Sequence, residues 1–365
     1  MNFTSIIILM GENIRDRLNQ ALSGEDVTQP VYAVYDWFVI NREINWQDLF
    51  YLGLGQINHA SLFEVEHPHL KIEESLSNDG NRTRKDVRWI TDMGELHEWS
   101  VDGWVREYMI KSPNDYKIMQ RALQDAKFSP TNQYFDESER ALGDSGITIG
   151  HLGQYEDVGY RRTPLQVIQI DFTGLEQFSF DIAMEAPGLF DLLEMMNAQF
   201  LDLFKCVTKT RASHIKLWEN LSIETIGPDL FRKYMVPVYE KISRILEGSG
   251  QQLHVHYDGR LQSIADDIGR LDLYGIDSLT PPPEGDMSIK EARAHWPEKF
   301  FWMHPSLGID SLPDSEVEKY IMKMIREAKT RFGFLLSEEV PPNWKRTVPL
   351  ILETLDKYAQ GVLIP

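Results

Sequence analysis

A histidine and an aspartate two residues apart form the most informative chemical pattern in this sequence. His256 and Asp258 lie at the end of a predicted strand that begins at Gln252, and they precede Gly259. Alternate residues of an extended chain point to the same side, so an imidazole and a carboxylate would face one site. These are common zinc ligands, and a third ligand from a later strand would complete an open catalytic site. The alternative is that Asp258 starts a turn and that His256 only makes hydrogen bonds.

The third ligand is expected from the adjacent pair Glu338 and Glu339, which follows the apolar stretch 333–336. We therefore predict that His256, Asp258 and one of these glutamates bind a divalent metal, with zinc as the expected ion. His254 could replace Asp258, but its position predicts a side chain inside the wall of the sheet.

Other polar residues also follow short apolar segments. We predict catalytic roles for Glu219, His304 and Asp36, and substrate-binding roles for Trp37, His151 and Glu284. Glu219 could contact the substrate as a ligand or proton acceptor, or it could be a solvated loop acid. The prolines before Glu284 could hold it in place or simply make a rigid connection. Taken one at a time, His151 and His304 fit a plain hydrogen-bonded histidine better than a functional one.

These residues form one site only if the strands before them share one sheet. Five short apolar segments, most of them followed by a helical pattern, occupy residues 213–360. With earlier strands expected at 31–35 and 147–150, the count is compatible with eight. This alternation predicts an α/β fold of the (β/α)8 barrel type, whose functional residues lie just past the C-terminal ends of strands. We expect one barrel domain over residues 1–365.

Residues 60–105 follow a different pattern and are expected to form an antiparallel β insertion in the N-terminal half. Two segments, 62–66 and 87–91, have the partial alternation of strands. Between them the Asp79-Gly80 pair is a strong signal for a hairpin turn.

The composition excludes several classes of function. The 365 residues include 37 basic and 56 acidic side chains, and the net charge of -19 argues against nucleic acid and anionic membranes as partners. No apolar run approaches the ~18 residues of a membrane helix. The glycine patterns of nucleotide-binding loops are absent. The single cysteine, Cys206, permits no internal disulfide, and we expect it to be buried in a cytoplasmic protein.

The order of several segments resembles the uroporphyrinogen decarboxylase superfamily, which includes methyltransferases that work with corrinoid proteins. The sequence His256-x-Asp258-Gly259 lies where the methyltransferase branch has His-x-Cys-Gly. The resemblance covers most of the chain, and its other segments are 15–25, 91–96, 174–187, Glu219 with 227–231, 275–279 and 336–342.

Departures from the family pattern modify the activity that the resemblance implies. The family's thiol-specific zinc methyltransferases use His-Cys-Cys, whereas this chain has His256, Asp258 and Glu338 or Glu339. Oxygen ligands make a metal a harder Lewis acid, which suits an ether or hydroxyl oxygen. The resemblance therefore implies a metal-dependent methyltransferase that moves a methyl group from a methoxy-type substrate to a corrinoid. A partner protein would carry the cobalamin. The sequence leaves open whether the chain forms a homodimer.

Two other hypotheses are a metal-free enzyme and a binding protein. The first is a decarboxylase or lyase for a smaller carboxylic acid, with Asp36 and His256 as proton donors. The second holds a corrinoid or tetrapyrrole without catalysis. We expect no turnover of polycarboxylated porphyrinogens, because residues 36–43 replace the family's Arg-x-x-Gly-Arg segment with a single arginine beside acids.

Overall fold

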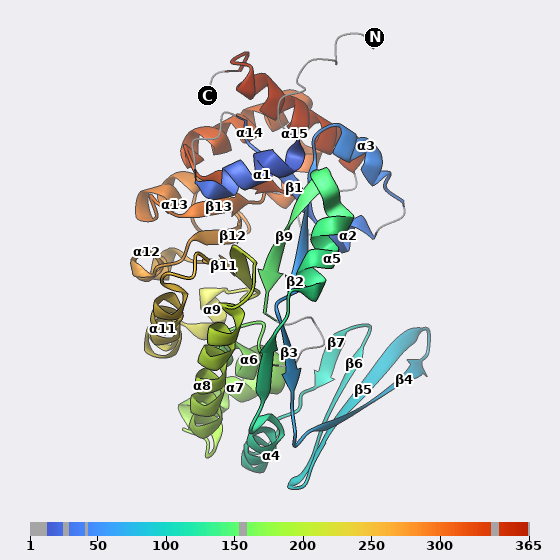
Figure 1. Cartoon of the computed structure of the whole chain (residues 1–365), viewed down its shortest axis with the longest axis vertical. Helices are drawn as coiled ribbons and strands as arrows, with labels where there is room; N and C mark the ends of the chain where they lie inside the picture. The colour runs from blue at the N-terminus through green and yellow to red at the C-terminus, as the bar shows by residue number, and fades with distance from the viewer. Residues whose placement is uncertain (1–12, 25–28, 41–42, 153–158, 337–342, 364–365) are drawn as a thin grey trace.

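A closed barrel of parallel strands forms the centre of the molecule (Figure 1). The structure, a computed structural model, describes residues 13–24, 29–40, 43–152, 159–336 and 343–363. Over these residues each of eight barrel strands pairs with its neighbours in chain order, and the last pairs with the first. The barrel strands are β1 (Tyr32–Tyr35), β2 (Gly55–Ser61), β9 (Gly146–His151), β10 (His214–Leu217), β11 (Gln252–His256), β12 (Gly275–Leu279), β13 (Phe300–Met303) and β14 (Phe332–Leu335). The predicted (β/α)8 barrel is confirmed.

Helices follow most barrel strands and cover the outside of the barrel, so the strands are buried on both faces and read as apolar runs. The α-helices are α1 (Ile14–Ser23), α2 (Asp36–Val39), α3 (Trp46–Tyr51), α4 (Pro113–Leu123), α5 (Gln133–Leu142), α6 (Pro164–Val167), α7 (Gly174–Ala183), α8 (Leu189–Val207), α9 (Ile223–Ile226), α10 (Pro228–Leu230), α11 (Val236–Leu246), α12 (Ala265–Arg270), α13 (Ile289–His295), α14 (Asp314–Ala328) and α15 (Trp344–Ala359). The 3-10 helices are η2 (Gly143–Ser145), η5 (Gln262–Ile264) and η6 (Leu307–Ser311), and the π-helical segments are η3 (Ile168–Thr173) and η4 (Phe231–Met235). Among these described helices, none combines the length and apolar character needed to cross a membrane. Cys206, in α8, is buried as expected.

The barrel interior is filled by large side chains that face glycines on neighbouring strands. A Cβ on Gly275 would lie 2.4 Å from the imidazole of His254, and a Cβ on Gly333 would lie 2.3 Å from the indole of Trp302. Protein interiors are close-packed, so these glycines make room for the rings. His254 is buried in this layer, as its position in the sequence indicated.

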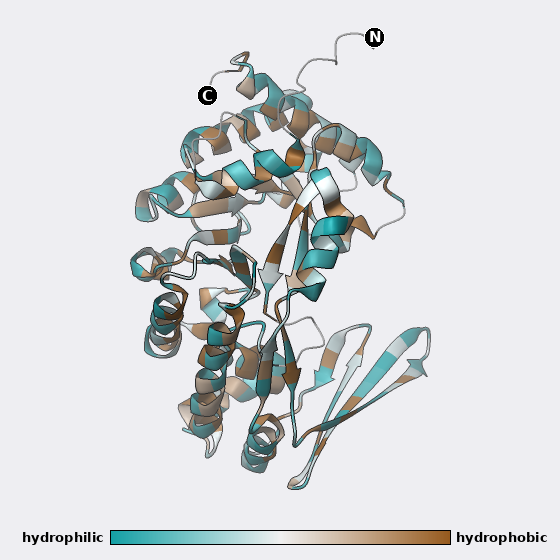
Figure 2. Cartoon of the chain, viewed as in Figure 1, coloured by the Kyte–Doolittle hydropathy of each residue, from teal (hydrophilic) through white to brown (hydrophobic). Residues whose placement is uncertain are grey.

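Two antiparallel sheets stand between β2 and β9. The smaller pairs β3 (Phe63–Glu66) with β8 (Lys127–Pro130), and the larger contains β4 (Lys71–Asp79), β5 (Arg82–Thr91), β6 (Gly94–Val101) and β7 (Trp104–Glu107). The predicted antiparallel insertion is present, with the hairpin turn between β4 and β5. Its boundaries need correction, because residues 60–61 belong to barrel strand β2 and the larger sheet continues to Glu107. Figure 1 shows this sheet projecting from the barrel, and Figure 2 shows hydrophilic residues along much of β4 and β5.

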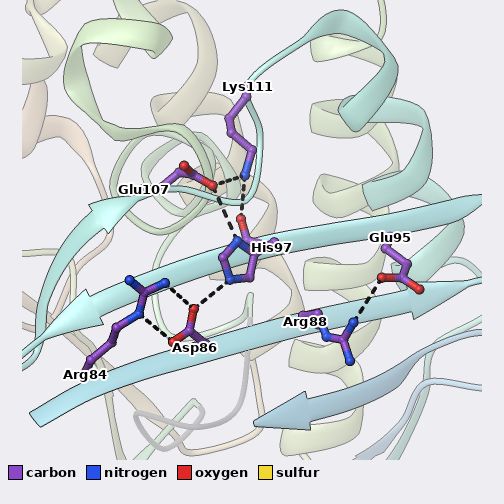
Figure 3. A network of polar contacts seen from close by, with 7 residues as sticks. All are labelled: Arg84, Asp86, Arg88, Glu95, His97, Glu107 and Lys111. Atoms are coloured by element: carbon purple, nitrogen blue, oxygen red, sulfur yellow. Dashed lines mark hydrogen bonds and ion pairs between the residues drawn. The ribbon is translucent and has the colours of Figure 1, made fainter. Parts of the chain in front are cut away.

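Charged side chains on the larger sheet form ion pairs and hydrogen bonds with one another (Figure 3). Arg84 binds Asp86 through two hydrogen bonds of 2.7 and 2.6 Å, and His97 Nε2 lies 3.0 Å from the same carboxylate. Lys111 Nζ donates to Glu107 at 2.7 Å. These side chains therefore suit a solvated surface, since their charges already have partners on the same strand, on a neighbouring strand or just after the sheet.

Candidate active site

A buried carboxylate at the C-terminal end of the barrel, here called the mouth, connects four barrel strands. Asp277 of β12 accepts a hydrogen bond from Tyr35 OH at 2.5 Å through Oδ1. Its Oδ2 lies 2.6 Å from Lys216 Nζ and 2.7 Å from His256 Nδ1. Burial alone would raise the pKa of Asp277, but the charge of Lys216 and then the hydrogen bond with His256 hold it well below its usual range. Asp277 is therefore an ionised carboxylate that fixes a lysine, a tyrosine and a histidine.

Asp277 determines which nitrogen of His256 faces the mouth with a lone pair. A carboxylate only accepts hydrogen bonds, so Nδ1 of His256 carries a hydrogen, and Nε2 offers a lone pair whenever the imidazole is neutral. The Nε2 atom lies 3.6 Å from Asp258 Oδ2. The pKa of Asp258 is pushed upward by burial, but the interaction with His256 outweighs this and leaves it lowered. The mouth thus presents an imidazole nitrogen next to an ionised carboxylate, as the sequence pattern indicated.

This pair fits two ligands of a divalent metal. Two atoms that bind one tetrahedral zinc at ~2 Å lie roughly 3.3 Å apart, close to the separation of His256 Nε2 and Asp258 Oδ2. Metal-binding histidines usually donate their other N–H to a carboxylate, as His256 does to Asp277. The predicted third ligand, Glu338 or Glu339, lies outside the described residues. Within the described residues, no group of three histidine, cysteine, aspartate or glutamate side chains could hold a metal.

A local irregularity in β12 places two consecutive polar residues in the buried network. The register of β12 with β13 shifts between Ile276 and Leu279, and Ser278 has a φ of 63°. Bulges of this kind redirect side chains next to active sites. Ser278 Oγ lies 3.0 Å from Nε2 of His304, which follows β13. His304, predicted as catalytic, is therefore next to the Asp277 network and buried.

A second histidine–carboxylate pair lies on β1 and β2. Asp36 Oδ1 is 3.1 Å from His59 Nδ1, and Asp36 Oδ2 accepts the backbone N–H of the same histidine at 3.2 Å. Burial lowers the pKa of His59, so its imidazole is neutral. Burial acts to raise the pKa of Asp36, but the contacts with His59 outweigh it and the net pKa is lowered. His151, another predicted site residue, has its ring centroid 6.2 Å from that of His59.

Aromatic rings connect the two histidine pairs. The ring centroid of Trp218 lies 5.4 Å from that of His256 and 4.9 Å from that of His59. Trp37, predicted to bind substrate, lies 5.0 Å from Trp218. The ammonium of Lys216 lies 3.7 Å from the centroid of Trp218, a cation–π geometry. Both tryptophans are half-buried, so they contribute apolar surface to the mouth.

The carboxylates of two other predicted site residues, Glu219 and Glu284, accept hydrogen bonds from neighbouring groups of the protein. Glu219 is fully buried, and its carboxylate accepts hydrogen bonds from Thr163, Gln166 and Tyr239. Burial raises its pKa, and these bonds oppose the shift. This geometry favours support of the site over contact with the substrate. Glu284 accepts hydrogen bonds from Ser306 Oγ and Leu307 N, both at 3.0 Å, and so connects two loops.

Sequence reasoning missed several members of the site, although a signal existed for two of them. Lys216 and Asp277 are charged residues inside apolar strands, and a buried charge needs a partner of opposite sign. That rule alone could have paired them. Tyr35 and Ser278 have no such signal, and His59 was missed because β2 was not predicted.

Comparison with known proteins supports the fold. No protein-family model matches the sequence, and no curated protein matches it. A solved methyltransferase from Methanosarcina mazei is similar with a TM-score of 0.58 and 12% identity, over 95% of this chain and 99% of that chain. The two proteins share a fold. A B12-independent methionine synthase from Shewanella sp. W3-18-1 has a TM-score of 0.42 and 11% identity, over 88% of this chain and 86% of that chain, which is too distant to carry an argument.

Proposed function

We propose that the protein is a metal-dependent methyltransferase that moves a methyl group from a methoxy-type substrate to the reduced corrinoid of a separate carrier protein. His256 and Asp258 would hold the divalent metal, with zinc as the proposed ion and Glu338 or Glu339 as the proposed third ligand. The observation that carries this proposal is the 3.6 Å separation of His256 Nε2 and Asp258 Oδ2, with Nδ1 anchored to Asp277 at 2.7 Å. The fold shared with a methyltransferase is consistent with it.

The residues around the pair keep it in a binding geometry. Asp277 fixes the tautomer and orientation of His256, which increases the basicity of Nε2. Lys216 balances the charge of Asp277 within the barrel, so Asp277 stays ionised although it is buried. Tyr35 orients the other carboxylate oxygen. When bound, the metal would supply a Lewis acid for the ether oxygen of the substrate.

The transfer releases an alcohol, and the protein must leave that oxygen able to take a proton. The bond between the methyl carbon and oxygen breaks, its electron pair stays on oxygen, and the methyl group joins the reduced corrinoid of the carrier. One proton per turnover then reaches the oxygen. His304 is a candidate for its delivery, because it is held by Ser278 in the same network as Asp277.

The charges at the mouth weigh against the metal-free lyase. That hypothesis needs Asp36 as a proton donor, whereas its lowered pKa keeps it ionised at neutral pH. Asp36 and Asp258 together would repel a carboxylic acid substrate, and the charge of Lys216 is already shared with Asp277.

Methyl transfer to free reduced cobalamin tests the proposal. The zinc-loaded protein should methylate cob(I)alamin with 2-methoxyphenol as the methyl donor. The loss of cob(I)alamin absorbance measures the reaction. His256→Ala and Asp258→Ala should each abolish the reaction. His295→Ala is the matched control, since His295 makes a similar 3.0 Å contact with Asp266 on the outside of the barrel. Turnover that survives both site substitutions would contradict the proposal.

A further inference from the structure

We propose that His59 is a substrate-recognising residue of the mouth and that its Nε2 accepts a hydrogen bond from a hydroxyl group on an aromatic substrate. This names the substrate class for the site and so rests on the proposed function, but its structural basis is the separate pair of His59 with Asp36. It predicts a neutral aromatic ligand that carries a free hydroxyl group.

Asp36 leaves His59 in one tautomer. The carboxylate of Asp36 is ionised and can only accept hydrogen bonds, so the Nδ1 atom 3.1 Å away carries the hydrogen. The other carboxylate oxygen accepts the backbone N–H of His59, which fixes the orientation of the pair. The Nε2 atom therefore has a lone pair and acts as an acceptor.

This acceptor has no hydrogen-bond partner among the residues that the structure describes. The side chain of His59 is only 4% exposed, and Nε2 is buried without a hydrogen bond in the described part of the chain. A buried acceptor without a partner is costly, and a donor supplied by a ligand would remove that cost.

The surroundings of His59 indicate the chemistry of that ligand. The ring centroids of Tyr35, Trp37 and Trp218 lie 5.0, 5.1 and 4.9 Å from the imidazole. Trp37 and Trp218 are half-buried and offer flat apolar surface, which favours an aromatic body. The negative charge of Asp36 next to His59 disfavours an anionic ligand.

A matched pair of small ligands tests the inference by binding alone. The probes are 2-methoxyphenol and 1,2-dimethoxybenzene, which both carry a methoxy group on a benzene ring but differ in the hydroxyl donor. Calorimetric titration of the full chain should give at least tenfold tighter binding of 2-methoxyphenol. His59→Phe keeps a ring but removes the acceptor, so the two affinities should become equal within about twofold.

Asp36→Asn is the second variant, because it should reverse the hydrogen-bond character of His59. The amide NH2 can donate to Nδ1 while its oxygen accepts the backbone N–H, which moves the imidazole hydrogen to Nε2. The preference for 2-methoxyphenol should then be lost. His295→Phe is the control and should keep the wild-type ratio, since His295 makes a comparable contact with Asp266 outside the site. Thermal unfolding of each variant shows whether it is folded.

The inference is overturned if the wild-type protein binds the two probes equally or binds neither. It is also overturned if folded His59→Phe or Asp36→Asn keeps the tenfold preference. Discrimination between the probes without any zinc binding would contradict the proposed metal-dependent function and leave the role of His59 standing. Zinc binding without discrimination between the probes would contradict the role of His59 and leave the proposed metal-dependent function standing.

Discussion

Lys216 and Asp277 form an ion pair that is almost completely enclosed by the barrel, with side chains 1% and 2% exposed. Lys216→Met should leave Asp277 as a buried charge without its ammonium partner. Breaking a buried pair in this way costs about 3–5 kcal/mol of unfolding free energy, whereas removal of both charges costs much less. Urea unfolding of Lys216→Met and of the double variant with Asp277→Asn checks this. A loss below about 1 kcal/mol in the single variant would show that the pair is not needed.

Glu98 of β6 should make stability depend on pH near neutrality. Burial, and then the charge of Asp171, raise its pKa from 4.5 to about 7. Between these values the folded state binds more protons than the unfolded state, so stability falls as pH rises through this window. Glu98→Gln should remove that slope and stabilise the protein at pH 8 by about 1–2 kcal/mol, since partial exposure reduces the effect. Denaturant unfolding at pH 5 and pH 8 measures it, and parallel pH profiles for both proteins would contradict the assignment.

At the level of elements, the glycines of the barrel strands should tolerate no side chain. Gly333→Ala places a Cβ 2.3 Å from the Trp302 ring inside the barrel and should cost about 1–3 kcal/mol. Gly308→Ala, in η6, meets only Ser306 Oγ at 3.8 Å and should be close to neutral. Thermal unfolding of the two variants gives the comparison. Equal stability of both would mean that the interior near Trp302 can relax.

The clearest strand predictions come from continuous apolar runs. Segments such as 300–303 and 332–335 lie between helices and the barrel interior, so burial on both faces leaves a clear signal. Strand β2 has no such run, because it carries Asn58, His59 and Ser61. Its polar residues contact the site and helix α5, as in the hydrogen bond from Asn58 to Ser138. They interrupt the apolar pattern from which a strand would be predicted.

At the level of the whole molecule, the site depends on barrel closure. Tyr35 and Asp277 are 242 residues apart in the chain and meet only because the strands form a ring. The rule that functional residues follow barrel strands selected His256, Asp258, Asp36 and Trp37, which lie near the ends of barrel strands. It also selected Glu219, whose carboxylate is instead enclosed by hydrogen bonds. A position in sequence gives the strand end, but side-chain direction depends on twist and bulges such as the one at Ser278.

The central claim is that His256 and Asp258 bind a divalent metal, and a zinc titration of the purified chain tests it most directly. We predict one zinc per wild-type chain, with affinity that falls below about pH 6 because the ligand imidazole must be neutral. His256→Ala and Asp258→Ala should each weaken binding by at least about 100-fold, and His295→Ala should not change it. Wild-type protein that takes up no zinc, or His256→Ala protein that binds it as tightly as the wild type, would contradict the claim.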